Sequence, residues 1–123
     1  MADWWQWSPQ KEEEVLTFAV VGVGRFGTAV CRELISNGAD VLAADYSEKA
    51  IDDLRQLEPS IEARVIDCTD EESMKESGIL EMNTVVVGIS EPIEASITTT
   101  LIAKDSEGTK VKKVIARATS DLH

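Results

Sequence analysis

The sequence has few of the features that would place a protein in a membrane or on nucleic acid. No apolar run approaches the roughly 20 residues that a transmembrane helix needs. No basic segment followed by an apolar run stands at the N-terminus, so it does not resemble a signal peptide. Lysine and arginine number 12 against 23 aspartates and glutamates, which gives a net charge of -11. Because proteins bind nucleic acid chiefly by neutralising phosphates, this balance argues against a nucleic-acid-binding surface.

Cysteine, histidine and tyrosine are also scarce. The two cysteines, Cys31 and Cys68, show neither metal-ligand nor redox-pair spacing. We expect them to be buried reduced thiols, which suits a cytoplasmic protein, and we expect no metal site. The one histidine, His123, is the last residue, and the one tyrosine is Tyr46. The sequence therefore offers no internal histidine and no Tyr-Lys pair for general acid–base catalysis.

The first 14 residues differ from the rest. They contain all three tryptophans and a short acidic segment. We expect residues 1–14 to form a flexible leader whose tryptophans rest on the domain or on a neighbouring subunit. Tryptophan also favours membrane interfaces, but the acidic segment opposes contact with anionic lipid.

A glycine-rich turn dominates the remaining chain. The apolar run Phe18 to Val21 predicts a buried strand, and residues 28–37 predict a helix. Between them Gly22, Gly24 and Gly27 follow the G-x-G-x-x-G spacing. Such glycines permit the tight turn, the approach of a phosphate to the backbone and close helix–strand packing. A strand, this motif and a helix N-terminus together predict a phosphate-binding turn, whereas the alternative is a purely structural glycine turn.

An aspartate follows at the distance expected for a ribose-binding acid. Asp45 ends the apolar run Val41 to Ala44, 18 residues after Gly27. At the tip of a second strand, its carboxylate would accept hydrogen bonds from ribose hydroxyls. It would repel a 2′-phosphate, which disfavours NADP. The alternative is that Asp45 only begins a turn.

From Phe18 onward the sequence alternates predicted strands and helices. This pattern predicts an α/β parallel sheet with helices on both faces. With the glycine motif at the first turn, we expect a Rossmann-like sheet of order 3-2-1-4-5. The last helix and sixth strand of a full doubly wound sheet are missing, which suggests a truncated or incomplete domain of residues 15–123. The predicted strands cover residues 18–21, 41–44, 61–66, 85–87 and 111–117.

The remaining helices have their own signals. Ser47 predicts an N-cap for a helix with Ile51, Leu54 and Leu57 inward, and Thr69 begins a capping box for a short helix to Ser77. Pro92 predicts the first turn of a fourth helix. Three residues spaced by four predict its buried face: Ile93, Ile97 and Leu101. The fifth strand would leave an open edge, from which we expect self-association, there or through the leader.

The motif and its surroundings resemble a known family. The run from Phe18 to Gly27, with Arg25-Phe26-Gly27 after the glycines, resembles the first turn of the RCK N-terminal (TrkA-N) nucleotide-binding domain. It is most similar to the cytoplasmic regulatory subunits of bacterial Ktr and Trk potassium-uptake systems. The resemblance extends over about residues 16 to 119 and includes these further segments: 41–45, 67–69, 85–89, 94–104 and 114–118.

The resemblance implies a role for particular residues. The three glycines would approach the phosphates, Arg25 would reach the terminal phosphate, and Arg117 would lie near the phosphates. Asp45 would hold the ribose, and Asp67 and Cys68 would border the adenine. From the residues alone, Arg25 and Arg117 could equally be solvated and Asp67 a turn residue. The complete expected site is Gly22, Val23, Gly24, Arg25, Phe26, Gly27, Asp45, Tyr46, Asp67, Cys68 and Arg117.

The resemblance also implies ligands and partners. The ligand would be ATP, ADP or NAD(H), which the fingerprint does not distinguish. The domain would assemble as a homo-oligomer, from dimer to octameric ring, and regulate a separate membrane ion-translocating subunit. It would be cytoplasmic and peripheral to the inner membrane through that partner, without inserting itself. The alternative from a different class is the cofactor domain of an NAD-dependent oxidoreductase.

Overall fold

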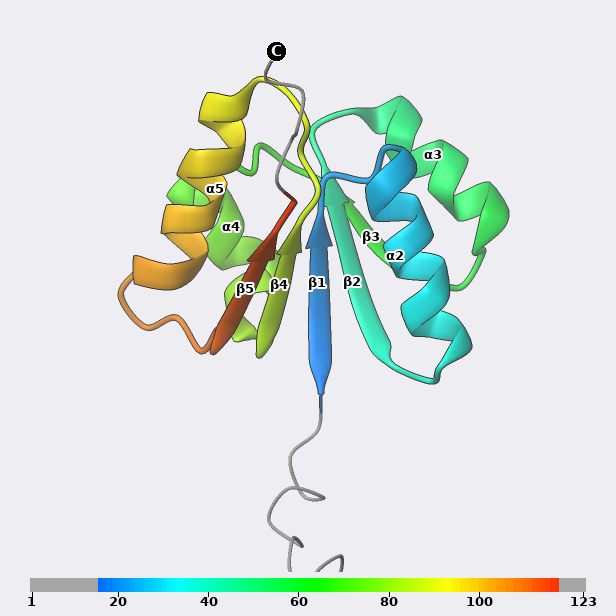
Figure 1. The fold of residues 1–123 in the computed structure, drawn as a ribbon, viewed down its shortest axis with the longest axis horizontal. Coiled ribbons are helices and arrows are strands. Elements are labelled where there is room, and N and C mark those ends of the chain that lie inside the picture. The colour runs from blue at the N-terminus through cyan, green and yellow to red at the C-terminus, as the bar shows by residue number, and fades with distance from the viewer. Residues whose placement is uncertain (1–15, 118–123) are drawn as a thin grey trace, which may run out of the picture.

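The apolar runs of the sequence form a five-stranded parallel sheet in the computed structural model, which describes residues 16–117 (Figure 1). The predicted order is confirmed: the strands lie in the order β3-β2-β1-β4-β5, and every neighbouring pair is parallel. The leader and His123 lie outside the described residues. The strands are β1 (Thr17–Val21), β2 (Asp40–Asp45), β3 (Glu62–Val65), β4 (Thr84–Val87) and β5 (Lys113–Ala116).

Helices cover both faces of the sheet. In Figure 1, α2 and α3 lie on one side and α4 and α5 on the other. Alternate strand residues supply the two cores: Val20 packs towards α2 and α3, whereas Ala19 and Val21 join the core beneath α4 and α5. The helical segments are α2 (Arg25–Ser36), α3 (Glu48–Leu57), α4 (Glu71–Ser77), the 3₁₀ turn η2 (Ile79–Glu81) and α5 (Ile93–Asp105).

The helix starts agree with the sequence predictions in part. Ser47 caps α3 as predicted, since its side chain accepts a hydrogen bond from the Ala50 N–H at 3.1 Å. The predicted N-cap at Thr69 was wrong by one residue. Asp70 caps α4 instead, and its side chain accepts a hydrogen bond from the Ser73 N–H at 3.0 Å. Helix α2 begins at Arg25 rather than Thr28, so the arginine lies in its first turn.

The predicted buried face of α5 was wrong. Ile93, Ile97 and Leu101 are 51–53% exposed, and Thr99 and Ala103 are fully buried instead. The reason is that α5 carries apolar residues on two faces, and the face with Thr99, Ile102 and Ala103 is the one that approaches the sheet. In α3 the prediction was right for Ile51 and Leu54, whereas Leu57 at the helix end is 48% exposed.

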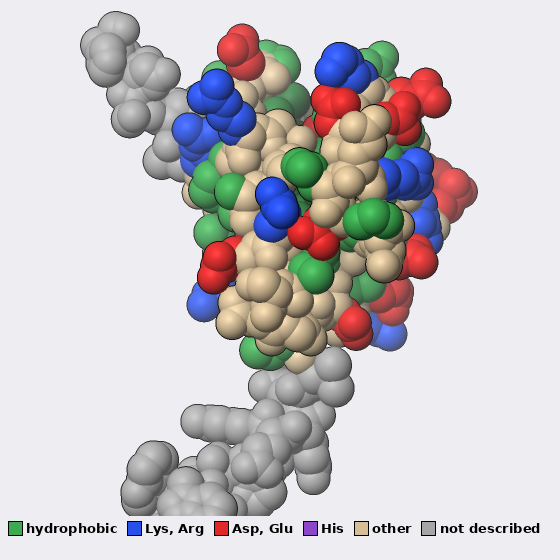
Figure 2. Space-filling view, turned by 90° about the vertical axis from the view of Figure 1, so that its right-hand side faces the viewer, with side chains coloured by type: hydrophobic (Ala, Val, Ile, Leu, Met, Phe, Trp, Pro, Cys, Tyr) green, Lys and Arg blue, Asp and Glu red, His purple; other side chains and the backbone are tan. Residues whose placement is uncertain are grey.

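The surface over α2 and α3 differs from the exposed face of α5. Figure 2 shows acidic and basic side chains interspersed on this side, with hydrophobic side chains scattered among them. Exposed ion pairs lie here, such as Arg32–Glu58 at 3.2 Å and Lys49–Asp53 at 2.9 Å. Pairs of this kind contribute little to stability.

Within residues 16–117, we find no helix with the length and apolar character needed to cross a bilayer.

Three glycines bring the start of α2 against the carboxyl ends of β1 and β4. Gly22 has φ +94°, and a Cβ there would lie 2.7 Å from the Ile89 nitrogen. A Cβ on Gly27 would overlap the carbonyl oxygen of Gly22, and one on Gly88 would lie 2.8 Å from that oxygen. The backbone of α2 therefore packs directly on the backbone of the turns after β1 and β4, and this leaves no room for a side chain at Gly22, Gly27 or Gly88.

We predict that Gly27→Ala destabilises the domain by roughly 1–3 kcal/mol or more, because overpacking forces the backbone apart. Thermal unfolding followed by circular dichroism measures this. Gly24→Ala is the matched control, since no heavy atom lies within 4 Å of a Cβ built there and its φ is negative. Equal melting temperatures for the two variants would contradict the packing argument.

Candidate functional site

A cleft of about 850 Å³ opens at the carboxyl end of the sheet. It lies where the connections from β1 and β4 leave towards opposite faces, the position at which open α/β sheets bind ligands. Its walls come from the turns after all five strands. The residues that line it are Gly22, Gly24, Arg25, Phe26, Asp45, Tyr46, Ser47, Ala50, Asp67, Cys68, Thr69, Gly88, Ile89, Ser90, Glu91, Pro92, Ala95 and Arg117.

Asp45 joins two of these turns. Its Oδ2 accepts a hydrogen bond from the Val23 N–H, and its Oδ1 accepts one from the Ser47 N–H, both at 2.8 Å. The glycine turn is also fixed by the Gly22 N–H, which donates to the Ala44 carbonyl at 2.8 Å. Each carboxylate oxygen can accept a second hydrogen bond. The aspartate therefore holds the glycine turn and keeps acceptor capacity that faces the cleft.

The N-terminus of α2 provides an anion-binding element. Its N-cap is Gly24, with no side-chain cap and no acidic residue in the first turn. The first hydrogen bond that returns to the cap comes from the Thr28 N–H, at 2.9 Å. Within the described residues, the N–H groups of Arg25, Phe26 and Gly27 precede this bond and have no acceptor in the helix, so they can donate to a ligand. The helix dipole also favours negative charge there.

Two arginines flank this helix start. Arg25 is the first residue of α2, and Arg117 directly follows β5. Both are exposed, and within residues 16–117 neither forms an ion pair. The guanidinium of Arg117 lies over the Phe26 ring, 5.1 Å from the centroid. Positive charge is thus concentrated at one end of the cleft.

The turn after β3 forms the opposite wall. Asp67 Oδ1 accepts hydrogen bonds from the Thr69 side chain at 2.6 Å and the Thr69 N–H at 3.0 Å. These bonds lower the pKa of Asp67, so it is a carboxylate at neutral pH. Burial, with smaller contributions from the charges of Asp45 and Asp67, raises the pKa of the Cys68 thiol to about 12. Cys68 is therefore an unreactive, protonated wall residue.

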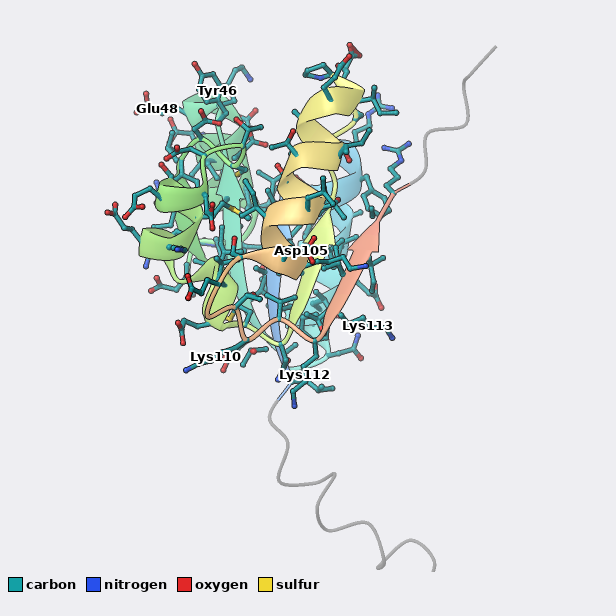
Figure 3. All side chains as sticks on the ribbon, turned by 90° about the vertical axis from the view of Figure 1, so that its left-hand side faces the viewer. Tyr46, Glu48, Asp105, Lys110, Lys112 and Lys113 are labelled. Carbon is teal, nitrogen blue, oxygen red and sulfur yellow. The ribbon has the colours of Figure 1, made fainter. Side chains whose placement is uncertain are left out.

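Nine of the eleven predicted site residues line the cleft. The other two act from behind it: Val23 is only 2% exposed and contributes its N–H, and Gly27 packs on Gly22. Tyr46 is 78% exposed at the rim of the cleft, above the strand ends in Figure 3.

The sequence prediction missed the wall that follows β4. Residues 88–92 and Ala95 line the cleft from the β4–α5 connection and the start of α5. A parallel sheet that reverses its order at β1 and β4 must place this connection beside the glycine turn, so the predicted topology held the signal. Thr99 was also missed: its hydroxyl is fully buried and donates to the Cys68 carbonyl at 2.9 Å, which ties α5 to the Asp67 wall.

The lysines in and just before the start of β5 do not belong to this site. Figure 3 shows Lys110, Lys112 and Lys113 at the opposite end of the sheet from Tyr46. Lys110 pairs with Glu81 at 3.1 Å.

Comparison with known proteins identifies the family. A family model described as the TrkA-N domain matches residues 18–123. The chain is 37% identical over 106 residues to Ktr system potassium uptake protein C of Bacillus subtilis (strain 168), covering 86% of this chain and 46% of that protein. It is 40% identical over 89 residues to Ktr system potassium uptake protein A of Vibrio alginolyticus, covering 72% of this chain and 40% of that protein.

Solved structures agree with the fold. The TrkA-N domain of the inner membrane protein ybaL from Escherichia coli superposes with a TM-score of 0.67 at 23% identity, over 89% of this chain and 77% of that one. The NAD(P)-binding domain of an exopolyphosphatase-related protein from Archaeoglobus fulgidus gives 0.69 at 26% identity, over 86% and 75%. The chain spans less than half the length of the two Ktr proteins above. From the match over residues 18–123, this chain belongs to the TrkA-N domain family.

Proposed function

We propose that this domain binds an adenine nucleotide in the cleft and that its occupancy regulates a potassium-uptake system. The observation that carries the proposal is the hydrogen bond from the Val23 N–H to Asp45 Oδ2 at 2.8 Å. It holds a ribose acceptor beside an uncapped helix N-terminus, so one cleft offers partners for both the ribose and the phosphates of a nucleotide. The family match and the similarity to Ktr potassium uptake proteins support the regulatory part.

The ligand is ATP, ADP or NAD(H). The cleft volume of about 850 Å³ suits a mononucleotide or a dinucleotide. NADP is disfavoured because its 2′-phosphate would meet the Asp45 carboxylate.

Regulation fits the residues of the cleft better than hydride transfer does. In the described part of the chain, no histidine or lysine lines the cleft, and Tyr46 points out at the rim. A general acid for a dehydrogenase therefore has no evident source there. A regulator instead needs two conformations that differ in nucleotide affinity, and a cytoplasmic domain peripheral to the inner membrane would pass that difference to a membrane subunit.

We further propose that the domain is a homo-oligomer, from dimer to octameric ring. The exposed apolar residues Ile93, Ile97 and Leu101 form one stripe of α5, and Ile115 is 44% exposed on the edge strand β5. Such a surface is typical of a contact between copies, because burial of an apolar stripe drives association.

The ribose contact is tested with Asp45→Asn and two ligands, ATP and 2′,3′-dideoxy-ATP. The wild-type protein should bind ATP roughly ten- to a hundredfold more tightly than dideoxy-ATP, because loss of a charge-assisted hydrogen bond costs about that much affinity. In the Asp45→Asn variant the ratio of the two affinities should fall to a few-fold. Any disturbance of the glycine turn would weaken both ligands alike, so the ratio reports only on the contact with the ribose hydroxyls. Calorimetry measures it, with Asp52→Asn, an exposed aspartate outside the cleft, as control; an unchanged ratio would make Asp45 a turn residue only.

The role of Arg25 is tested with ligands of increasing charge. Arg25→Ala should cost more affinity for ATP than for ADP, and more for ADP than for AMP, because the arginine reaches the terminal phosphate. If the ligand is NAD(H), the loss should be modest and equal for both redox forms. Titrations at one ionic strength measure this, with Arg64→Ala outside the cleft as control. Equal losses for ATP, ADP and AMP would contradict a terminal-phosphate contact.

The α5 stripe is tested by Ile97→Glu. Burying a charge in the contact should weaken self-association at least tenfold, as measured by sedimentation equilibrium. Leu57→Glu is the matched control, since Leu57 is similarly exposed on α3 at 48%. A monomeric wild-type protein, or equal association of the two variants, would contradict this surface.

A further inference from the structure

Arg117 and Phe26 meet above the end of β4, although 91 positions separate them in the chain. The guanidinium carbon lies 5.1 Å from the ring centroid, within the roughly 6 Å range of a cation–π contact. Both residues line the cleft.

The Phe26 ring packs against the backbone of Gly88. A Cβ on Gly88 would lie 3.3 Å from Phe26 Cδ2, so the glycine leaves the space that the ring occupies. Phe26 is half-buried and packs against the core between the sheet and α2 and α3. Its position is therefore set by packing and does not depend on Arg117.

Arg117 is held by its backbone at one end and by its guanidinium at the other. Its backbone N–H donates to the Val87 carbonyl at 3.1 Å and extends the β4–β5 ladder by one residue. The guanidinium at the other end lies over the ring. A guanidinium carries five N–H donors, and its contact with one ring leaves donors that suit phosphate oxygens. The ring and a phosphate can therefore contact the arginine at the same time.

We propose that Phe26 is a positioning residue, which holds the Arg117 guanidinium over the cleft so that its N–H groups donate to the phosphates of the bound nucleotide. This inference rests on the proposed nucleotide binding. It assigns the aromatic residue of the glycine turn a role separate from that of Arg25, its neighbour in α2.

The test is a double-mutant cycle with Phe26→Leu and Arg117→Ala, titrated with ATP, ADP and AMP. Phe26→Leu should weaken ATP binding about two- to fivefold, the value of an exposed cation–π contact, with a smaller loss for ADP and the smallest for AMP. Phe26→Tyr, which keeps the ring, should restore the affinity. In the Arg117→Ala background, Phe26→Leu should have no further effect.

Three outcomes would overturn the proposal. They are an equal loss for the three nucleotides, failure of Phe26→Tyr to restore binding, and full additivity with Arg117→Ala. If Phe26→Leu does not fold, Phe26→Met fills the same space without a ring and gives the same test. The proposed function fails separately, if the wild-type protein binds none of ATP, ADP, AMP and NAD(H).

Discussion

Backbone contact among Gly22, Gly27 and Gly88 is the constraint on which the site depends. It draws the first turn of α2 onto the ends of β1 and β4 more closely than any side chain would permit. The free N–H groups of the helix then point across the end of the sheet. The same contact leaves room for the Phe26 ring on Gly88. The glycines therefore fix the position of the helix start, the ring and, through the ring, Arg117.

The cleft also explains how an acidic protein could hold a polyanion. The chain carries a net charge of -11, and Asp45, Asp67 and Glu91 line the cleft itself. The donors are grouped at the α2 N-terminus, where the free N–H groups of the helix lie between Arg25 and Arg117. Beyond about 10 Å salt screens the surrounding charge, so this local grouping decides where phosphates bind. The carboxylates of Asp45 and Asp67 suit the uncharged, donor-bearing ribose and base.

Much of this arrangement could be read from the sequence. Alternating strand and helix signals predict the parallel sheet, and the G-x-G-x-x-G spacing at the first turn adds the strand order. The same spacing with Asp45 predicts the centre of the site. The buried face of α5 could not be predicted, because apolar residues occupy two of its faces and periodicity does not choose between them. Thr99 resembles any mid-helix threonine until the fold places its hydroxyl against the Cys68 carbonyl. The cation–π contact of Arg117 with Phe26 likewise depends on contact between distant segments.

The central claim is that the nucleotide lies across the carboxyl ends of the strands, anchored by the glycine turn and Asp45. The most direct measurement is a titration of ¹⁵N-labelled protein with ADP and with NAD, followed by amide chemical shifts. The account predicts the largest shifts at Val23 to Phe26, at Tyr46 and Ser47, and at residues 67–69. Amides at the opposite end, such as Asp40, Glu62 and Lys113, should stay in place. No shifts with either ligand, or shifts confined to that opposite end, would contradict the account.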